Sequence, residues 1–508
     1  MKEVRTRFAP SPTGFMHIGN LRTALYAYLF AKKNGGRFVL RIEDTDRERY
    51  VEGAEDVVYR TLRTSGIEVD EGPREGGAFA PYVQSERQKR GIYKKYAEEL
   101  IARGGAYYCF CSKERLEGLT DANGVRTYDK HCLKLSREEI KKKLAAGASY
   151  VIRQNVPKGV LTVYEDLVFG EIGVDSDELE DNILIKSDGM PTYNFANVID
   201  DRLMGITHVL RGVEYLSSTP KYNLIYDAFG WERPVYIHLQ LIMKDAARKL
   251  SKRYGDANFE DFIAKGYLPQ AIINYIALLG WSPKDNAEKM SMDELIANFS
   301  VEGLSRSCSI FDENKMRWLN SQYIKELSLA EFTRLAAPFI ARSKAAELGL
   351  DTGKIARLLH TRAETLSDIP KLIDFIAEYY GAPLDLSLFV NQKWKTDGVV
   401  AAKILELYLD GIDGVNDLGG INGAGAHKAN NTDKADGAEF GEERLQTYLS
   451  GLAEKNGYKK GQVLWCVRIA VTGRAATPGG AVEMLCLLGA EESKRRVRYA
   501  LDALRKGA

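Results

Sequence analysis

The chain has 508 residues, of which 45% are hydrophobic and 28% are charged, and its formal net charge is +1. A chain of this size can bury several cores and divide into roughly three to five domains. Its six cysteines are too sparse for a disulfide scaffold, and its sequence has neither a long apolar run nor an apolar signal core at its charged start. These features exclude a small disulfide-rich protein, and we expect a cytoplasmic protein with no membrane partner. The near-zero charge leaves a nucleic-acid partner open, because such binding depends on where charges lie.

The first segments predict a strand, a helix and a second strand in succession. Residues 4–8 are extended, and apolar side chains then recur at helical spacing from Leu21 until Gly35 ends the pattern. Residues 38–43 alternate with the period of a strand. Such a βαβ unit implies a parallel sheet with a right-handed crossover, whose ligands bind beyond the carboxyl ends of the strands.

A Gly- and Pro-containing loop separates the first strand from the helix. Its sequence, SPTGFMHIGN at residues 11–20, stands at a helix N-terminus, where backbone N–H groups and the helix dipole favour an anion. Alone, His17 would most often only cap the helix or face solvent. No G-x-G-x-x-G opens the helix and no Walker motif occurs, so a phosphate site must depend on other residues. A second loop, KLSKR at residues 249–253, adds cationic groups that could neutralise a triphosphate. Together the two loops favour nucleotidyl transfer.

The remaining segments predict an α/β protein with a helical C-terminal half. Residues 85–189 combine charged helices, a cysteine-rich turn and a strand, as in a domain inserted into the first one. Extended segments up to about residue 255 complete the parallel sheet, and helical periodicity dominates from residue 256 onward. Residues 411–442 are rich in Gly, Asn, Asp and Ala, which predicts a flexible surface insertion.

Spaced motifs along nearly the whole chain resemble those of bacterial-type glutamyl-tRNA synthetases, which are class I aminoacyl-tRNA synthetases. Residues 7–20, RFAPSPTGFMHIGN, resemble the HIGH region of that family, and residues 249–253 resemble its KMSKS loop. Further matches follow in the family's order: RIEDTD at 41–46, SDGMPTY at 187–193, NVIDD at 197–201, RGVEY at 211–215, LW at 464–465 and LLG at 487–489.

The resemblance implies a domain order and an activity. The implied domains are a Rossmann-like parallel-sheet catalytic domain at 1–84 and 190–255, an inserted α+β acceptor-end-binding domain at 85–189, a stem-contact domain at 256–328, and α-helical anticodon-binding domains at 329–382 and 383–508. The implied enzyme is a glutamate–tRNA ligase. It converts glutamate and ATP to glutamyl-adenylate and pyrophosphate, and then transfers glutamate to the 3'-terminal adenosine of tRNA(Glu).

A pocket for free glutamate needs two separated cations and an acceptor, because glutamate has two carboxylates and an ammonium group. Arg7 and Arg211 can bind the carboxylates, and Glu43 can accept from the α-ammonium group. The family assigns the side-chain carboxylate to Arg7, although the division between the two arginines stays open. The implied glutamate-binding residues are Arg7, Ala9, Ser11, Glu43, Tyr193, Asn197 and Arg211.

The resemblance places ATP between the two loops, with His17, Lys249 and Lys252 as catalytic residues. The implied ATP-binding residues are Ser11, His17, Gly19, Asn20, Glu214, Lys249, Leu250, Ser251 and Lys252. Mg²⁺ is expected with ATP, but its ligands stay open, since Asp44 and Asp46 could equally hold a loop or contact the tRNA end. Two departures from the family are Asn20, in place of a second histidine, and RGVEY, in place of a motif with a second acid and a tryptophan or histidine.

A cysteine cluster in the inserted segment is a candidate zinc site. Its ligands would be Cys109, Cys111 and Cys132, completed by Tyr128 or by His131. Some family members have a histidine where this chain has Lys134, which is a poor zinc ligand. The alternative is a set of reduced cysteines in a small hydrophobic hairpin.

The tRNA partner is predicted from the helical C-terminal half. Arg362 matches an arginine that in the family favours glutamate over glutamine anticodons, although such an arginine more commonly contacts a phosphate or nothing. Charging of tRNA(Gln) as well stays open. We expect a monomer without a DNA partner.

Three other functions would fit part of these motifs. The short glutamyl-queuosine tRNA synthetases lack the C-terminal helical domains. A glutaminyl enzyme is disfavoured by Arg7 and the RIED segment. An inactive tRNA-binding paralogue is disfavoured because His17, Lys249 and Lys252 are all retained.

Overall fold

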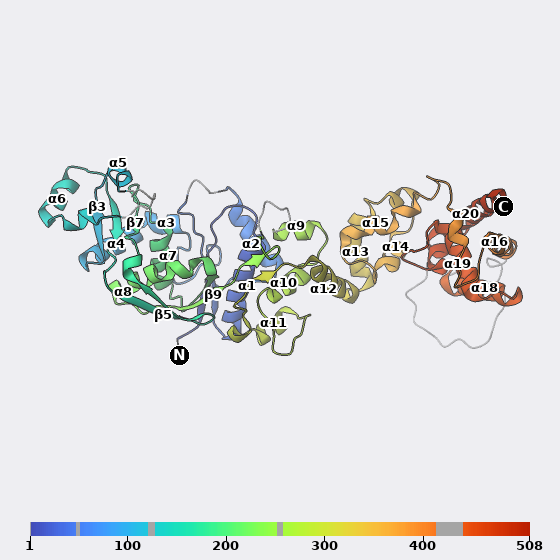
Figure 1. The fold of residues 1–508 in the computed structure, drawn as a ribbon, viewed down its shortest axis with the longest axis horizontal. Helices are drawn as coiled ribbons and strands as arrows, with labels where there is room; N and C mark the ends of the chain where they lie inside the picture. Colours follow the sequence, from blue (N-terminus) through green and yellow to red (C-terminus); the bar gives the residue numbers. More distant parts are fainter. Residues whose placement is uncertain (1, 47–50, 120–127, 251–257, 413–439, 508) are drawn as a thin grey trace. The chain divides into compact units, whose positions relative to one another are not determined.

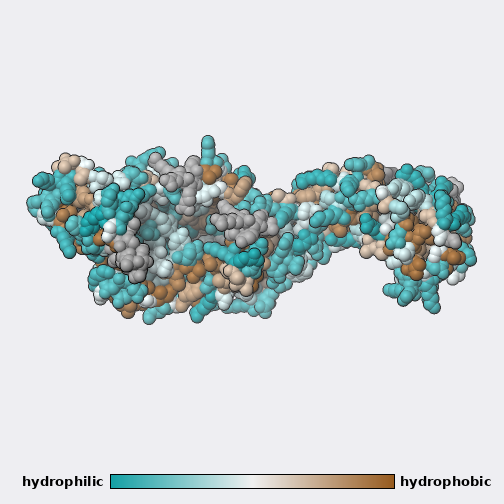
Figure 2. Space-filling view, turned by 45° about the horizontal axis from the view of Figure 1, so that its top comes forward, coloured by the Kyte–Doolittle hydropathy of each residue, from teal (hydrophilic) through white to brown (hydrophobic). Residues whose placement is uncertain are grey.

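The computed structural model describes residues 2–46, 51–119, 128–250, 258–412 and 440–507. Its contacts divide the chain into two units (Figure 1). The first comprises Met1–Ala264 and Leu268–Leu319, and the second comprises Lys265–Tyr267 and Asn320–Ala508. No helix within the described ranges is long and apolar enough to cross a bilayer. Hydrophilic residues predominate on the face shown in Figure 2, where hydrophobic residues form only small patches.

The first unit begins with the predicted βαβ arrangement. β1 (Arg5–Phe8) pairs in parallel with β2 (Arg37–Leu40), and α1 (Ile18–Lys33) connects the two strands. The chain leaves the helix through Gly35, whose φ of 63° lies in the left-handed region that favours glycine. The parallel unit and its helix are therefore confirmed.

The second strand is shorter than predicted, since it ends at Leu40 rather than at residue 43. The chain stays hydrogen-bonded beyond this point, because the amide of Glu43 donates to the carbonyl of Pro10 at 3.0 Å. Residues 41–43 thus continue alongside the segment that follows β1, outside the regular strand. This places the Glu43 side chain next to the loop that precedes α1.

A second sheet has the strand order β6-β5-β9-β8. Its strands are β5 (Leu161–Asp166), β6 (Gly170–Asp175), β8 (His208–Gly212) and β9 (Val235–Leu239). β8 and β9 are parallel, and β5 joins β9 in parallel through Asp166 and Tyr236. The amide of Thr207 donates to the carbonyl of Arg5 at 2.9 Å, so β8 begins beside β1. The Rossmann-like parallel layer is confirmed, and β5 and β6, which fall within residues 85–189, extend it.

Residues 85–189 also contribute a three-stranded antiparallel sheet. It consists of β3 (Ala106–Cys109), β4 (Val151–Gln154) and β7 (Ile183–Ile185) in the order β3-β4-β7. A shared core joins it to α4 (Ile92–Ala102), α7 (Tyr193–Leu203) and α8 (Thr219–Phe229). Fully buried Phe195 and Ile199 of α7 belong to this core, which anchors the helix that approaches the cleft described below.

The first unit contains several shorter elements. These are α2 (Ala54–Thr64), α3 (Gln84–Lys89), α5 (Lys113–Glu117), α6 (Arg137–Ala145), α9 (Phe259–Ala264), α10 (Pro269–Leu278), α11 (Met292–Asn298) and the paired strands β10 (Ile242–Met243) and β11 (Ser309–Ile310). α12 (Glu313–Glu326) continues from this unit into the second along the chain.

The second unit is built from helices, as predicted. They include α13 (Leu329–Ile340), α14 (Thr352–Leu359), α15 (Ile369–Ile373), α16 (Gly398–Ile412), α18 (Glu442–Lys455), α19 (Lys460–Thr472) and α20 (Ala481–Gly507), the last of which kinks at Gly489. The predicted flexible insertion at 411–442 falls largely outside the described residues, which leave out 413–439.

Candidate active site

A cleft of about 580 Å³ opens at the carboxyl ends of the parallel strands. The last residues of β1, β8 and β9, which are Phe8, Gly212 and Leu239, line it, as expected for a sheet of this kind. The cleft brings together these predicted residues: Arg7, Ala9, Ser11, His17, Gly19, Asn20, Glu43, Tyr193, Arg211, Glu214, Lys249 and Leu250. The predicted Ser251 and Lys252 lie outside the described residues.

His17 caps the N-terminus of α1. It has extended backbone angles, φ −66° and ψ 140°, and its Nδ1 accepts the amide of Gly19 at 3.0 Å. A neutral ring that accepts at Nδ1 carries its proton on Nε2, where it can donate. The capping role and a role toward an anion in the cleft are therefore compatible.

Lys249 and Leu250 line the cleft directly after a hydrogen-bonded turn. The amide of Lys244 donates to the carbonyl of Arg248 at 2.8 Å, and the amide of Leu250 donates to that of Ile242 at 3.1 Å. Asp245 accepts the amides of residues 247 and 248 within the turn. This arrangement brings Lys249 to the cleft, while the rest of the KLSKR loop continues beyond the described residues.

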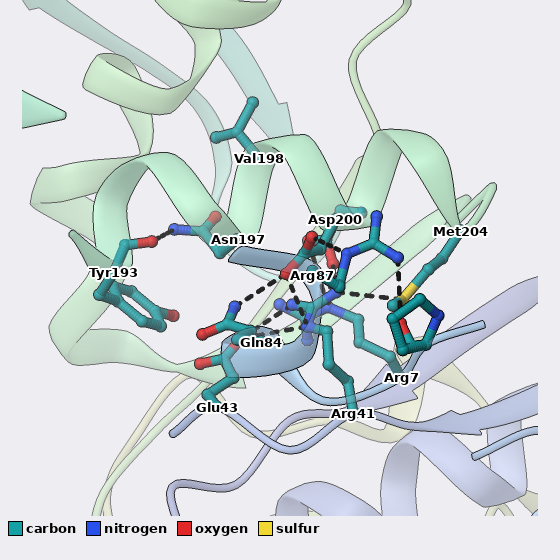
Figure 3. Close-up of polar contacts among 12 residues, drawn as sticks. Arg7, Arg41, Glu43, Gln84, Arg87, Tyr193, Asn197, Val198, Asp200 and Met204 are labelled. Atoms are coloured by element: carbon teal, nitrogen blue, oxygen red, sulfur yellow. Dashed lines mark hydrogen bonds and ion pairs between the residues drawn. The ribbon is translucent and has the colours of Figure 1, made fainter. Parts of the chain in front are cut away.

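Asp201 of α7 joins two arginines at the base of the cleft. Its Oδ1 lies 3.1 Å from Nε of Arg7 and 2.6 Å from Nη1 of Arg41. Arg41 also donates from Nη2 to Oε1 of Glu43 at 2.9 Å (Figure 3). None of these four side chains is more than 5% exposed. Glu43 and Arg7, which were predicted to bind glutamate, are therefore held by one hydrogen-bonded chain.

A second buried acid, Asp200, extends the network from Arg41, whose Nε lies 3.8 Å from Oδ2 of Asp200. It accepts from Nε of Arg87 at 2.6 Å, from Nε2 of Gln84 at 2.9 Å and from the hydroxyl of Tyr93 at 2.9 Å. Three guanidinium groups thereby balance three carboxylates: Arg7, Arg41 and Arg87 against Glu43, Asp200 and Asp201.

Burial and pairing act in opposite directions on two of these acids. Burial raises the pKa of Asp201, but the guanidinium groups of Arg7 and Arg41 outweigh it and hold that pKa below its ordinary value. For Glu43 burial prevails over Arg41, so the pKa of this carboxyl is raised. Glu43 is therefore protonated before Asp201 when the pH falls.

Asn197 is the predicted residue that the cleft lining does not include. It is only 2% exposed, and its Nδ2 donates to the carbonyl of Tyr193 at 2.6 Å, one helical turn earlier (Figure 3). Its part in glutamate binding stays a prediction, whereas Tyr193 itself lines the cleft.

Sequence reasoning assigned no role to Asp200, Asp201 or Arg41, although all three fall inside quoted motifs. One sequence feature could have indicated them: two acids follow the mostly apolar segment FANVI directly, where unpaired charges would be costly to bury. Nothing in the sequence indicated His238, which contacts Arg211, or Asp166, which contacts His238.

The cysteine cluster is assembled as predicted. The Sγ atoms of Cys109, Cys111 and Cys132 all lie within 4.8 Å of one another. The hydroxyl of Tyr128 is 3.2 Å from the first of these sulfurs and 3.6 Å from the second. His131 is exposed and is not part of the group. Of the two candidate fourth ligands, the structure therefore brings Tyr128 to the sulfurs.

The second unit contains a groove of about 650 Å³ that sequence reasoning did not identify as a site. Its lining residues are Trp394, Lys459, Lys460, Gly461, Leu464, Trp465, Arg468, Gly480 and Ala481. Trp465 donates from Nε1 to the carbonyl of Leu388 at 3.0 Å, and the guanidinium of Arg468 lies 4.9 Å from its ring centroid. Arg362 does not line this groove. It is exposed and donates to the carbonyl of Leu358 at 2.7 Å.

The fold and the cleft agree with the families that the chain matches. Residues 3–318 match the catalytic domain of class I tRNA synthetases for glutamate and glutamine, and residues 430–501 match an anticodon-binding domain. The first match spans more than half of the chain, so the class is that of the class I aminoacyl-tRNA synthetases.

Full-length relatives narrow this class. Glutamate–tRNA ligases of Lachnoclostridium phytofermentans and Clostridium kluyveri are each 50% identical to this chain, over 99% of both chains. The crystal structure of a glutamate tRNA ligase from Elizabethkingia meningosepticum, in complex with its amino acid, has a TM-score of 0.82 and 34% identity, and covers 99% of this chain and 100% of its own. The chain therefore belongs to the glutamate–tRNA ligases. The family resemblance is confirmed over the full length. A short glutamyl-queuosine tRNA synthetase, which lacks the C-terminal helical domains, would match only the catalytic half.

Proposed function

We propose that this glutamate–tRNA ligase activates L-glutamate with ATP in the 580 Å³ cleft and transfers it to the 3'-terminal adenosine of tRNA(Glu). One observation carries the proposal. Arg7, Arg211 and Glu43 line the same cleft as His17 and Lys249, so a dicarboxylate amino acid and a triphosphate can lie side by side.

The amino-acid site follows from the atoms that the protein leaves for a ligand. Arg7 uses Nε and Nη1 on Asp201 and Leu210, so Nη2 can bind a carboxylate. Glu43 uses Oε1 on Arg41, so Oε2 can accept from the α-ammonium group. Arg211 supplies the second cation. Charge-assisted hydrogen bonds of this kind are among the strongest a site can offer.

The activation step forms a bond between an α-carboxylate oxygen of glutamate and the α-phosphorus of ATP, and breaks the bond from that phosphorus to the leaving pyrophosphate. The N-terminal amides of α1 and Nε2–H of His17 can bind phosphate oxygens on one side. Lys249 can neutralise the charge that develops on the pyrophosphate, and we propose the same for Lys252.

Mg²⁺ is expected to accompany ATP. Among the described residues, the one group of three side chains placed to ligate a metal is the cysteine cluster, so the described part of the cleft offers no dedicated cage. Mg²⁺ is commonly held by substrate phosphates with one or two carboxylates. No step above depends on a protein ligand to it.

The cysteine cluster suits zinc. Tetrahedral zinc with Zn–S bonds of about 2.3 Å requires sulfurs about 3.8 Å apart. Sγ of Cys111 and Sγ of Cys132 are 3.5 Å apart, and the Tyr128 hydroxyl supplies a fourth donor. We propose a structural zinc ion that joins β3 to the turn around Cys132.

The tRNA is proposed to bind through both units. The groove around Trp465 lies largely within the anticodon-binding match, and its indole rings and cations suit a stacked nucleotide base beside phosphates. Arg362 is proposed to favour tRNA(Glu) over tRNA(Gln). The domain boundaries given above, a monomeric state and a cytoplasmic location, where ATP and tRNA are found, belong to the same proposal.

The central test is pyrophosphate exchange and aminoacylation with glutamate or glutamine, each with and without tRNA(Glu). We expect activity with glutamate and none with glutamine, and pyrophosphate exchange that appears only when tRNA is present. Lys252→Ala should lose adenylate formation at least 100-fold with nearly unchanged tRNA affinity. Lys284→Ala, which removes an exposed lysine outside the cleft lining, is the matched control. Unchanged aminoacylation in Lys252→Ala would contradict the role of that lysine.

The tRNA specificity needs its own comparison. Wild type and Arg362→Gln are assayed with tRNA(Glu) and tRNA(Gln), and we expect wild type to prefer tRNA(Glu) and the variant to lose part of that preference. Equal charging of both tRNAs by wild type would instead identify a non-discriminating enzyme.

A further inference from the structure

Three neighbouring strands place Asp166, His238 and Arg211 in one row. β8 and β9 pair in parallel with Arg211 opposite His238, and β5 joins β9 with Asp166 opposite Tyr236. Tyr236 and His238 are two residues apart on β9 and so point to the same face. The three side chains therefore lie on one face of the sheet, at the end that borders the cleft.

Hydrogen bonds connect the row. Nδ1 of His238 lies 2.7 Å from Oδ2 of Asp166, and Nε of Arg211 donates to Nε2 of His238 at 3.2 Å. Because an arginine can only donate, Nε2 must accept, and the proton of the neutral ring is on Nδ1. The other oxygen of Asp166 accepts the amides of Val168 and Phe169, both at 2.9 Å, which fixes the carboxylate in turn.

Arg211 is oriented without being neutralised. Its Nη2 donates to the hydroxyl of Thr219 at 2.6 Å, and the rings of Tyr222 and Tyr236 lie 4.9 and 5.2 Å from its guanidinium carbon. Within the described part of the chain no acid is ion-paired with Arg211, whereas Arg7 is paired with Asp201. Its nearest acid in this row, Asp166, acts through the neutral imidazole. The charge of Arg211 thus stays available for an anionic ligand in the cleft.

We propose that His238 and Asp166 are positioning residues for Arg211 and thereby determine affinity for the substrate carboxylate. The inference rests on the proposed glutamate site. Asp166 selects the tautomer of His238, the imidazole fixes one edge of the guanidinium, and Nη1 faces the ligand. A carboxylate in direct contact would hold Arg211 equally well but would cancel the charge that attracts a substrate carboxylate.

A pair of substitutions at His238 separates its two hydrogen bonds. His238→Gln can retain an acceptor toward Arg211, whereas His238→Asn can retain a donor toward Asp166 but loses that acceptor. We expect KM for glutamate to rise about ten-fold or more in His238→Asn and clearly less in His238→Gln, with kcat and KM for ATP within about two-fold of wild type. Asp166→Asn should resemble His238→Asn, because an amide favours the wrong tautomer.

The pH profile gives a readout that does not depend on the Asn variants folding. Burial lowers the pKa of His238; the charged groups that act on the ring are Asp166, Arg211 and Glu214, and the Tyr236 ring centroid lies 6.1 Å from it. Protonation at acid pH turns Nε2 into a donor, so KM of wild type should rise there. His238→Gln should lack the part of the rise in KM that protonation of His238 causes. It should keep the part caused by groups that both enzymes have, such as Glu43.

His208→Gln is the control, since His208 lies on β8 and contacts the hydroxyl of Thr207 rather than Arg211. Equal KM values for His238→Asn, His238→Gln and wild type, with the same acid limb, would overturn the proposal. Arg211→Gln separates a failure of the proposed glutamate site from a failure of the positioning role of His238. An unchanged KM for glutamate in Arg211→Gln would reject the proposed site itself. If KM rises in Arg211→Gln but stays at the wild-type value in both His238 variants, only the positioning role is rejected.

Discussion

Single residues in the cleft are held by shared partners rather than by isolated pairs. Asp201 serves Arg7 and Arg41 at once, and its lowered pKa shows that the two cations outweigh its burial. Loss of such an acid leaves two buried guanidinium groups without a counter-charge, which is far more costly than loss of a surface ion pair.

Asp201→Asn is therefore expected to weaken glutamate binding and to destabilise the fold. We expect KM for glutamate to rise about 10- to 100-fold and the free energy of unfolding to fall by about 3 kcal/mol. Steady-state kinetics and urea unfolding measure the two effects. Asp200→Asn is the matched control, because Asp200 binds Arg87, Gln84 and Tyr93 instead of Arg7. Equal increases in KM for both variants would show that general loosening, rather than the hold on Arg7, is responsible.

At the scale of elements, β1 is fixed by a buried ion pair at its first residue. Arg5 binds both oxygens of Glu71, at 2.8 and 2.9 Å, and the hydroxyl of Tyr82 donates to the same carboxylate at 2.6 Å. The hydrogen bonds from Arg5 are the main reason that the pKa of Glu71 is lowered. A lowered carboxyl pKa contributes stability above its unfolded value of about 4.5 and loses that contribution as the pH falls through the folded value.

Glu71→Gln should thus lower the free energy of unfolding by about 3 kcal/mol at pH 7. The difference from wild type should begin to shrink below about pH 4.5, where the unfolded state is protonated first, and should shrink further as the pH falls through the lower folded pKa. Urea unfolding as a function of pH measures this. Glu232→Gln, at an exposed pair with Lys2, should leave stability nearly unchanged. A Glu71→Gln deficit that persists unchanged at pH 3 would contradict the electrostatic cause.

The turn around Cys132 gives a second prediction at this scale. If zinc joins it to β3, the purified enzyme should contain about one zinc per chain, and Cys111→Ser should lose most of it. Metal analysis by mass spectrometry measures the content. Cys308→Ser is the control, since this exposed cysteine lies outside the cluster. Equal, substoichiometric zinc in wild type and both variants would favour reduced thiols.

Local elements could be predicted from the sequence, but long-range partners could not. The helix from Ile18 follows from apolar spacing and a glycine stop, which are properties of consecutive residues. By contrast, Asp166 and His238 are 72 residues apart, and only the pairing of β5 with β9 brings them together. The motifs identified Arg7 and Glu43, whereas their common support by Asp201 depends on how α7 packs against the sheet.

At the scale of the whole molecule, the proposed glutamate site and the proposed tRNA groove lie in different units. The cleft belongs to the first unit and the Trp465 groove to the second, each within its own set of contacts. Substitutions in the glutamate site should therefore act on KM for glutamate, those in the groove should act on tRNA binding, and the two effects should combine additively.

Trp465→Ala is expected to lower kcat/KM for tRNA about 10- to 100-fold, because stacking of one base contributes about 1–3 kcal/mol. KM for glutamate should not change. Trp465→Phe keeps an aromatic face and should lose less, which separates stacking from the hydrogen bond to Leu388. The double variant with Asp201→Asn should show the product of the single effects. An altered KM for glutamate in Trp465→Ala would contradict the division between units.

The balanced charges beneath the cleft also determine how the enzyme should respond to ionic strength. Arg7, Arg41 and Glu43 are at most 5% exposed, so mobile ions screen them little. Affinity for glutamate should therefore change only slightly between low and high salt, whereas binding of tRNA, which displaces counterions from phosphates, should weaken steeply. In a cell whose salt content fluctuates, the supply of charged tRNA would then be limited by capture of the nucleic acid rather than of the amino acid.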